Sequence, residues 1–421
     1  MQSCKCPRTN TGSASATSYP TRLLDFGKPS ARPTVRLIHT ADEIVHGHYN
    51  TLSYCWGGFQ SLKLLDSNLT AFQSGIAIRE LPLTFQHARE VCLLMGVRYL
   101  WIDSLCIIQD QHDQSDFIRE SRTMHLVYAD ALLNISATAS TDSSAGLFRD
   151  RNVSSIPVQG VMALNGDAYE LLDQSYWLRM VMSAPVNRRA WVLQERLLAK
   201  RVLHFTAHEV MWECDEFYAS ERYPNGIPRI SVSRQAELDR SLEYSHDHRR
   251  LGILSRTESE TSDYGQFYRL WWETVEMYTR VRLTFADDRP IAILGLAERF
   301  SSVFGEYRSG MWVSQKFENQ FLWTSVPINH HTNQKESYSD PGLSFCWLSA
   351  GCRVVQRTAE SDNCLMRVDA LIAQSGLPDA PIVAADVCGV CIPITIQSVE
   401  YWWYWKFHRN GKLLGAEVHP N

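Results

Sequence analysis

The sequence lacks long apolar runs and a strong charge of either sign. No run approaches the roughly 18–20 apolar residues that cross a bilayer, and the N-terminal segment lacks the apolar stretch of a signal peptide. The formal net charge is −5 and no Lys/Arg stripe runs along the chain, so nothing indicates nucleic-acid binding. We therefore expect a cytoplasmic protein without a membrane span, with the nucleus as the alternative compartment.

Disulfide and cofactor motifs are also sparse. The 11 cysteines are odd in number and several lie inside apolar segments, which favours free buried thiols over disulfides. Cys388 and Cys391 form one CxxC pair, but without a second pair this spacing is a weak zinc signal. The chain also lacks the GxGxxG, P-loop and GxSxG motifs. The sequence therefore predicts neither a metal nor a bound cofactor.

A strand–helix–strand pattern opens the ordered part of the chain. Residues 49–56 (YNTLSYCW) are aromatic and β-branched and stop at Gly57 and Gly58, as a buried strand does. A helix follows, with Thr84 as its N-cap and apolar residues at helical spacing. Residues 98–103 (RYLWID) are apolar enough for a second strand. The short connections predict a right-handed parallel βαβ unit.

The alternation continues in a third segment. Ser115 or Asp116 can cap a helix, and residues 131–137 (ALLNISA) follow as a buried strand. This order predicts an α/β fold in which a small parallel, doubly wound sheet has helices on both faces. Farther along, the pattern predicts a helix over 187–198 and a hairpin that joins 201–205 to 209–214.

The composition divides the chain into four regions. A mixed α+β region follows the α/β domain; an amphipathic helix begins there at Tyr264, and a second helix begins at Pro290. The predicted regions are a disordered tail (1–20), the α/β domain (35–195), the mixed α+β region with a polar insert at about 220–262 (196–340), and a β-rich C-terminal region (341–421).

Polar residues follow the first two predicted strands. In a doubly wound sheet, ligands bind beyond the carboxyl ends of the strands, and glycine lets a ligand approach the backbone closely. The predicted substrate-binding residues are Ser53, Trp56, Gly57, Gly58, Asp103 and Ser104. The alternative is structural: the two glycines make a turn and Asp103 caps it.

Glu120 is the candidate catalytic residue. At about 100° per residue, it lies about 60° from Phe117 and about 40° from Met124, at the edge of the apolar stripe of its helix. A buried glutamate is uncommon without a partner and is suited to acid–base chemistry. The alternative is a structural ion pair with one of three arginines, or a hydrogen bond to a backbone amide. These arginines are Arg98, Arg119 and Arg122.

Taken in order, these segments resemble the fungal heterokaryon-incompatibility (HET) domain. The similarity covers nearly all of the chain to about residue 350. The resemblance implies a role in non-self recognition between fungal strains that ends in regulated cell death. The matching runs are YNTLSYCWGG (49–58), LPLTFQHAREVCLLMGVRYLWIDSLCIIQD (81–110), ESRTMHLVYADALLNISATAS (120–140) and GLF (146–148).

The resemblance also suggests a chemistry. HET domains are thought to resemble the Toll/interleukin-1 receptor fold, some members of which cleave NAD at its glycosidic bond with a glutamate. NAD is thus a possible substrate, although the spacing from Phe117 to Glu120 does not reproduce the Trp-x-x-x-Glu pattern of those enzymes. Two alternatives remain: a non-catalytic module that acts by self-association or by binding a protein partner, and an orphan paralogue without an incompatibility role.

Overall fold

A computed structural model gives two compact units. Unit 1 contains Met1–Asp263 and Val281–Arg299, and unit 2 contains Tyr264–Arg280 and Phe300–Asn421. The predicted tail, 1–20, lies outside the described residues except for its last two positions, as does most of the predicted polar insert. The structure describes residues 19–27, 34–58, 62–110, 112–150, 160–164, 167–171, 173, 175–215, 217–228, 264–281, 283, 288–308, 310–313, 320, 323–326, 347–349, 353–356, 366–373, 382–389, 394–399, 402–409 and 412–420.

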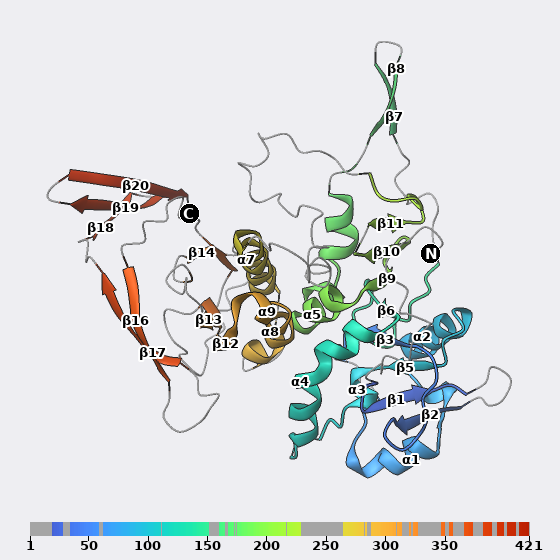
Figure 1. The fold of residues 1–421 in the computed structure, drawn as a ribbon. Coiled ribbons are helices and arrows are strands. Elements are labelled where there is room, and N and C mark those ends of the chain that lie inside the picture. Colours follow the sequence, from blue (N-terminus) through green and yellow to red (C-terminus); the bar gives the residue numbers. More distant parts are fainter. Residues whose placement is uncertain are drawn as a thin grey trace. The chain divides into compact units, whose positions relative to one another are not determined.

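Unit 1 is built on a nine-stranded mixed sheet (Figure 1). Its four central strands, β5, β3, β6 and β9, are parallel, and antiparallel strands extend the sheet at both edges. The α/β class is therefore confirmed, but the sheet is larger and more mixed than the sequence predicted. In spatial order the strands are β11 (Tyr218–Ser220), β10 (Val210–Cys214), β9 (Arg201–Phe205), β6 (Leu133–Ser136), β3 (Tyr49–Ser53), β5 (Tyr99–Trp101), β1 (Arg22–Asp25), β2 (Thr34–His39) and β4 (Ile76–Ala77).

Helices cover both faces of this sheet (Figure 1). Right-handed crossovers place α2 (Leu83–Leu94) on one face. They place α4 (Ser115–Asp130) and α5 (Ala190–Leu198) on the other, because the chain turns back across β3 after β5. A later helix, α8 (Arg289–Glu298), packs on both α4 and α5. The central strand β3 is buried along its whole length, as expected for a strand covered on both faces.

Glycine lets α8 approach its neighbours closely. A Cβ at Gly295 would lie 2.5 Å from the Cβ of His125 on α4 and 2.6 Å from Oε1 of Gln194 on α5. No larger residue fits there without moving a helix. Pro290 lies in the first turn of α8, as the sequence predicted.

The two predicted N-caps are wrong. Pro82, and not Thr84, is the N-cap of α2; the buried Thr84 hydroxyl accepts a hydrogen bond from the Gly146 amide at 3.1 Å. The N-cap of α4 is Gln114, and its side chain makes no capping bond. The carboxylate of Asp116 instead pairs with a buried arginine, Arg22, at 2.8 Å. A charged, buried partner outweighs the gain from a cap.

Unit 2 is centred on the amphipathic helix α7 (Tyr264–Arg280). The helix predicted to begin at Tyr264 is confirmed, and four apolar residues at helical spacing form its buried face, each at most 4% exposed: Phe267, Trp271, Val275 and Tyr278. Its other elements are α9 (Ser301–Phe304), β12 (Glu306–Arg308), β13 (Met311–Val313), β14 (Trp323–Val326), η10 (Trp347–Ser349), β15 (Arg353–Gln356), β16 (Met366–Ala373), β17 (Ile382–Gly389), β18 (Ile394–Val399), β19 (Trp402–Arg409) and β20 (Lys412–Pro420).

Short elements complete unit 1. The predicted hairpin of 201–205 with 209–214 is confirmed as β9 and β10, which pair antiparallel. None of the helices in the described ranges has the length and apolarity needed to cross a bilayer. The remaining elements are η1 (Asp66–Asn68), α1 (Leu69–Ser74), η2 (Ile78–Glu80), α3 (Asp103–Cys106), β7 (Gly160–Leu164), β8 (Asp167–Leu171), η4 (Leu178–Met182) and η5 (Val186–Arg188).

Candidate functional site

The carboxyl ends of β3 and β5 bring four of the predicted site residues into one region. Trp56 donates its indole N–H to Oδ2 of Asp103 at 2.9 Å, and the Ser104 amide donates to Oδ1 at 2.7 Å. The Ser104 hydroxyl accepts a hydrogen bond from Tyr54 at 2.7 Å. Ser53 ends β3 and is 1% exposed. The ends of two neighbouring strands are thus linked side chain to side chain.

A glutamate that the sequence analysis did not single out joins this region. Glu195 lies on α5, is 4% exposed, and accepts a hydrogen bond from the Ser53 hydroxyl. The Tyr128 hydroxyl, on α4, is a second donor to the same carboxyl group. The Asn134 amide in turn donates to the Ser53 oxygen at 2.9 Å. Buried donors from two elements, β3 and α4, therefore converge on Glu195.

The pKa values of both carboxyl groups are raised. Burial raises the pKa of Glu195 to about 7; the Arg189 charge opposes this shift and the Asp103 charge adds to it. Burial also raises the pKa of Asp103, against the Arg189 charge and the hydrogen bond from Trp56. A carboxyl group with a pKa near neutrality can gain and lose a proton at working pH, which is what acid–base catalysis requires.

Against the effect of burial, the positive charge of Arg189 lowers the pKa of both carboxyl groups, but its guanidinium forms a hydrogen bond with neither. It is the N-cap residue of α5, half-buried, and its guanidinium donates to the Tyr54 carbonyl oxygen. Within the described ranges this carbonyl is its hydrogen-bond partner, and no carboxylate lies within ion-pair distance. The arginine therefore ties the loop after β3 to the start of α5.

The residue after Glu195 anchors the same helix. Arg196 makes a two-pronged ion pair with Glu213 on β10, with N–O distances of 2.6 and 2.9 Å. His204 on β9 lies 3.0 Å from Glu213 through Nε2 and 3.0 Å from the Thr138 hydroxyl through Nδ1. All four of these side chains are buried. This network fixes α5, and with it Glu195, against the sheet.

Gly57 allows the loop after β3 to lie against the loop after β6. Its φ of +65° is in the left-handed region, and a Cβ there would lie 2.4 Å from the Cβ of Asp142 and 2.9 Å from the Thr141 carbonyl oxygen. At Gly58, by contrast, a Cβ would meet no atom within 4 Å, and the φ is not positive. The two adjacent glycines thus have different roles.

We expect Gly57→Ala to destabilise the protein by about 2 kcal/mol or more, since it combines left-handed strain with overlap against a backbone oxygen. Gly58→Ala is the matched control and should change the free energy of unfolding by less than about 0.5 kcal/mol. Urea unfolding of both variants measures the difference. Equal effects would mean that the close approach at Gly57 does not matter.

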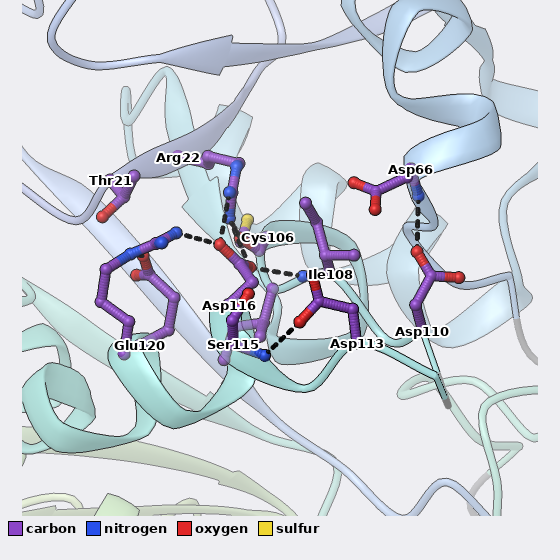
Figure 2. Close-up of polar contacts among 12 residues, drawn as sticks. Thr21, Arg22, Asp66, Cys106, Ile108, Asp110, Asp113, Ser115, Asp116 and Glu120 are labelled. Atoms are coloured by element: carbon purple, nitrogen blue, oxygen red, sulfur yellow. Dashed lines mark hydrogen bonds and ion pairs between the residues drawn. The ribbon is translucent and has the colours of Figure 1, made fainter.

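Glu120 lies in a different polar cluster, shown in Figure 2. Asp116 is its centre: it accepts hydrogen bonds from Arg22, from Arg119 and, at 2.8 Å, from the Ile108 amide. Glu120 is 5% exposed, and its carboxylate pairs with Arg119 at 3.3 Å. The sequence had offered an ion pair with Arg119 as the structural alternative to a catalytic role for Glu120, and the structure contains that ion pair. Its catalytic role stays a prediction.

One pattern in the sequence could have indicated Glu195 as a candidate catalytic residue. Trp191 precedes it by four residues, so the helix AWVLQE contains the Trp-x-x-x-Glu spacing that Phe117 and Glu120 do not reproduce. In the structure the Trp191 indole donates to Asp288 at 3.1 Å and its ring contacts that of Phe117 edge-on, with a centroid distance of 6.3 Å. Glu195 lies 142 residues beyond Ser53 in the sequence. Local sequence patterns therefore could not show that the two residues are in contact.

The chemistry of the region is that of two carboxyl groups, one arginine and several hydroxyls. Across the described ranges, no group of three or more His, Cys, Asp or Glu side chains could hold a metal ion. Cys55, Cys92, Cys106 and Cys214 are buried and form no disulfide. Burial raises the pKa of Cys55, which disfavours its thiolate.

Comparison with known proteins finds a family match for the part of the chain that contains these residues. Residues 49–195 match the family model described as Heterokaryon incompatibility protein (HET), which confirms the resemblance seen in the sequence motifs. No curated protein and no solved structure matches the chain. The matched range begins with strand β3 and ends at Glu195, so it contains both candidate glutamates and the carboxyl ends of β3 and β5.

Proposed function

Since residues 49–195 are a HET domain, we propose that this protein acts in fungal non-self recognition and regulated cell death, and that its HET domain cleaves a nucleotide such as NAD. The observation that supports cleavage is the buried Glu195 carboxyl group, held by Ser53 and Tyr128 close to Asp103 and Arg189. It lies near the strand ends where doubly wound sheets bind ligands.

The proposed reaction is hydrolysis of the bond between nicotinamide and ribose. The bonding electrons leave with nicotinamide, water adds to the ribose carbon, and one proton is released. Positive charge develops on the ribose as the bond breaks, and a nearby carboxylate stabilises it, as in other glycosidic cleavages. Ionised Glu195 is suited to this role, and Asp103 is suited to hold a ribose hydroxyl.

NAD consumption by the purified protein tests this proposal. We expect Glu195→Gln to lower the turnover rate by about 100-fold or more, because Gln cannot supply the negative charge. The wild-type rate should rise with pH through about 7, as Glu195 ionises. Glu120→Gln is the matched comparison, since Glu120 is equally buried but pairs with Arg119.

Three outcomes are decisive. Loss of turnover in Glu195→Gln alone supports Glu195, and loss in Glu120→Gln alone supports the residue predicted from the sequence. Absence of NAD consumption by the wild-type protein in every oligomeric state contradicts the cleavage proposal.

A second candidate function is a non-catalytic interaction module. Exposed apolar side chains on α4 and α8, namely Ile118, Leu126 and Leu294, are each more than 40% exposed and favour a protein contact or self-association. Under this proposal, a Glu195→Gln protein still kills cells on overexpression, while Leu126→Lys does not. The two functions therefore differ in one cellular assay.

A further inference from the structure

Arg189 lies near two buried carboxyl groups without forming an ion pair with either, which is unusual for an arginine. Its charge acts on both Asp103 and Glu195, yet its guanidinium forms an ion pair with neither and donates instead to the Tyr54 carbonyl oxygen. Arginine beside a carboxylate usually makes a two-pronged pair, as Arg196 does with Glu213. A guanidinium that keeps donors unused next to such partners is suited to an anion from outside the chain.

Both carboxyl groups already have their own donors. Asp103 accepts hydrogen bonds from the Trp56 indole and the Ser104 amide, and Glu195 accepts them from Ser53 and Tyr128. Neither oxygen pair therefore needs Arg189 for its hydrogen bonding. The arginine is also half-buried, so a ligand that reached it would displace little water and meet a strengthened charge.

A second cation lies on the exposed side of the same region. The Lys63 ammonium lies over the Trp56 ring, 4.8 Å from its centroid, and Trp56 is the residue that bonds to Asp103. Lys63 is exposed and, over the described ranges, forms no ion pair. The exposed Gly57 and Gly58 follow Trp56 directly, where a ligand can approach the backbone.

We infer that Arg189 and Lys63 bind the phosphate groups of the substrate, so that the site takes a nucleotide and rejects the corresponding nucleoside. This inference rests on the proposed function for the location of its site and adds the two residues that recognise the phosphate groups of the substrate. Arg189 binds the phosphate nearer the two carboxyl groups, and Lys63 binds a phosphate at the exposed side.

Calorimetric titration of the full chain with ADP and with adenosine tests this inference. The wild-type protein should bind ADP at least about tenfold more tightly than adenosine, and the preference should shrink with added salt. Arg189→Gln should weaken ADP binding about tenfold and Lys63→Gln about threefold, with adenosine binding unchanged. Arg189→Lys, which keeps the charge, should lose less than Arg189→Gln.

Arg79→Gln is the control, because Arg79 is an exposed arginine on η2 and takes part in none of the contacts described for the site. Equal wild-type affinity for ADP and adenosine, or unchanged ADP affinity in both Arg189→Gln and Lys63→Gln, overturns the inference. If Arg189→Gln does not fold, the exposed Lys63 decides: unchanged ADP affinity in Lys63→Gln then overturns it.

Failure here is distinguishable from failure of the proposed function. Glu195→Gln should retain ADP affinity while losing NAD turnover. ADP binding that depends on Arg189, in a protein that does not consume NAD, rejects the cleavage and keeps the phosphate site. If the protein consumes NAD but its ADP affinity is unchanged in both Arg189→Gln and Lys63→Gln, only the phosphate site is rejected.

Discussion

Replacing Glu195 by Gln should make the protein more stable at pH 8, by about 2–3 kcal/mol, even as it removes the proposed activity. The pKa of Glu195 is raised from 4.5 to about 7 because its carboxyl group is buried. At pH 8 the folded protein must hold a buried negative charge that the unfolded chain would expose to water. Gln has nearly the same shape and carries no charge.

The sign of the pH dependence follows from the raised pKa. The contribution of the neutral carboxyl group to stability is fully present below about pH 4.5 and is lost as pH rises through about 7. The stabilisation by Glu195→Gln should therefore be large at pH 8 and small at pH 4.5. Urea unfolding at both pH values measures it, with Glu80→Gln, an exposed carboxylate, as control.

A Glu195→Gln variant that is less stable than wild type at pH 8, by the same amount as at pH 4.5, would contradict a buried charge. Stability gained where activity is lost is the usual mark of a residue kept for chemistry. The combination of the two measurements is therefore more informative than either one alone.

Glu213→Gln should have the opposite effect, a loss of about 3–5 kcal/mol at pH 7, because it leaves the buried Arg196 without its anionic partner. Arg196 and His204 are both held by this carboxylate, and all three side chains are buried. The expected loss exceeds what a surface ion pair contributes, which is at most about 1 kcal/mol.

The pH dependence is again set by the direction of the shift. Burial alone would raise the pKa of Glu213, but Arg196 and His204 lower it to about 2. Its stabilisation is present above about pH 4.5 and is lost as pH falls through about 2, so the deficit of Glu213→Gln should shrink on acidification.

Adding Arg196→Met to Glu213→Gln should restore part of the lost stability, since it removes the unpaired charge. Chemical unfolding of the two single variants and the double variant gives the coupling. Strictly additive losses would show that Arg196 and Glu213 are not a coupled pair.

Local sequence patterns predicted the core of the fold because its elements follow one another in the chain. The strands β3, β5 and β6 and the helices α2 and α4 all lie close to their predicted positions. β1 was missed; its residues pair antiparallel with β2 and also with β5, which lies more than 70 positions later in the chain. Such pairing depends on tertiary contacts that no short window contains.

The same contrast holds for the site. The proximity of Ser53, Trp56, Asp103 and Ser104 could be predicted, because strand ends in a parallel sheet meet at one edge; their binding role stays a prediction. Glu195 could not be placed beside them, since it arrives on a helix that follows a long connection after β6. Glu120 was selected by helical phase, which predicts burial but cannot tell which neighbour the buried group will meet.

Helix α8 limits how this domain can pass from one protein to another. It packs in unit 1 on α4 and α5, yet in sequence it lies between two stretches of unit 2. A recombination event that moved residues 49–195 alone would carry Glu195 but leave behind both Arg196 and Glu213, the ion pair that anchors α5 to β10. It would also leave behind Gly295 and the helix seated on the outer surface of α5. The smallest cassette that could be inherited intact therefore extends to residue 299 and includes α7.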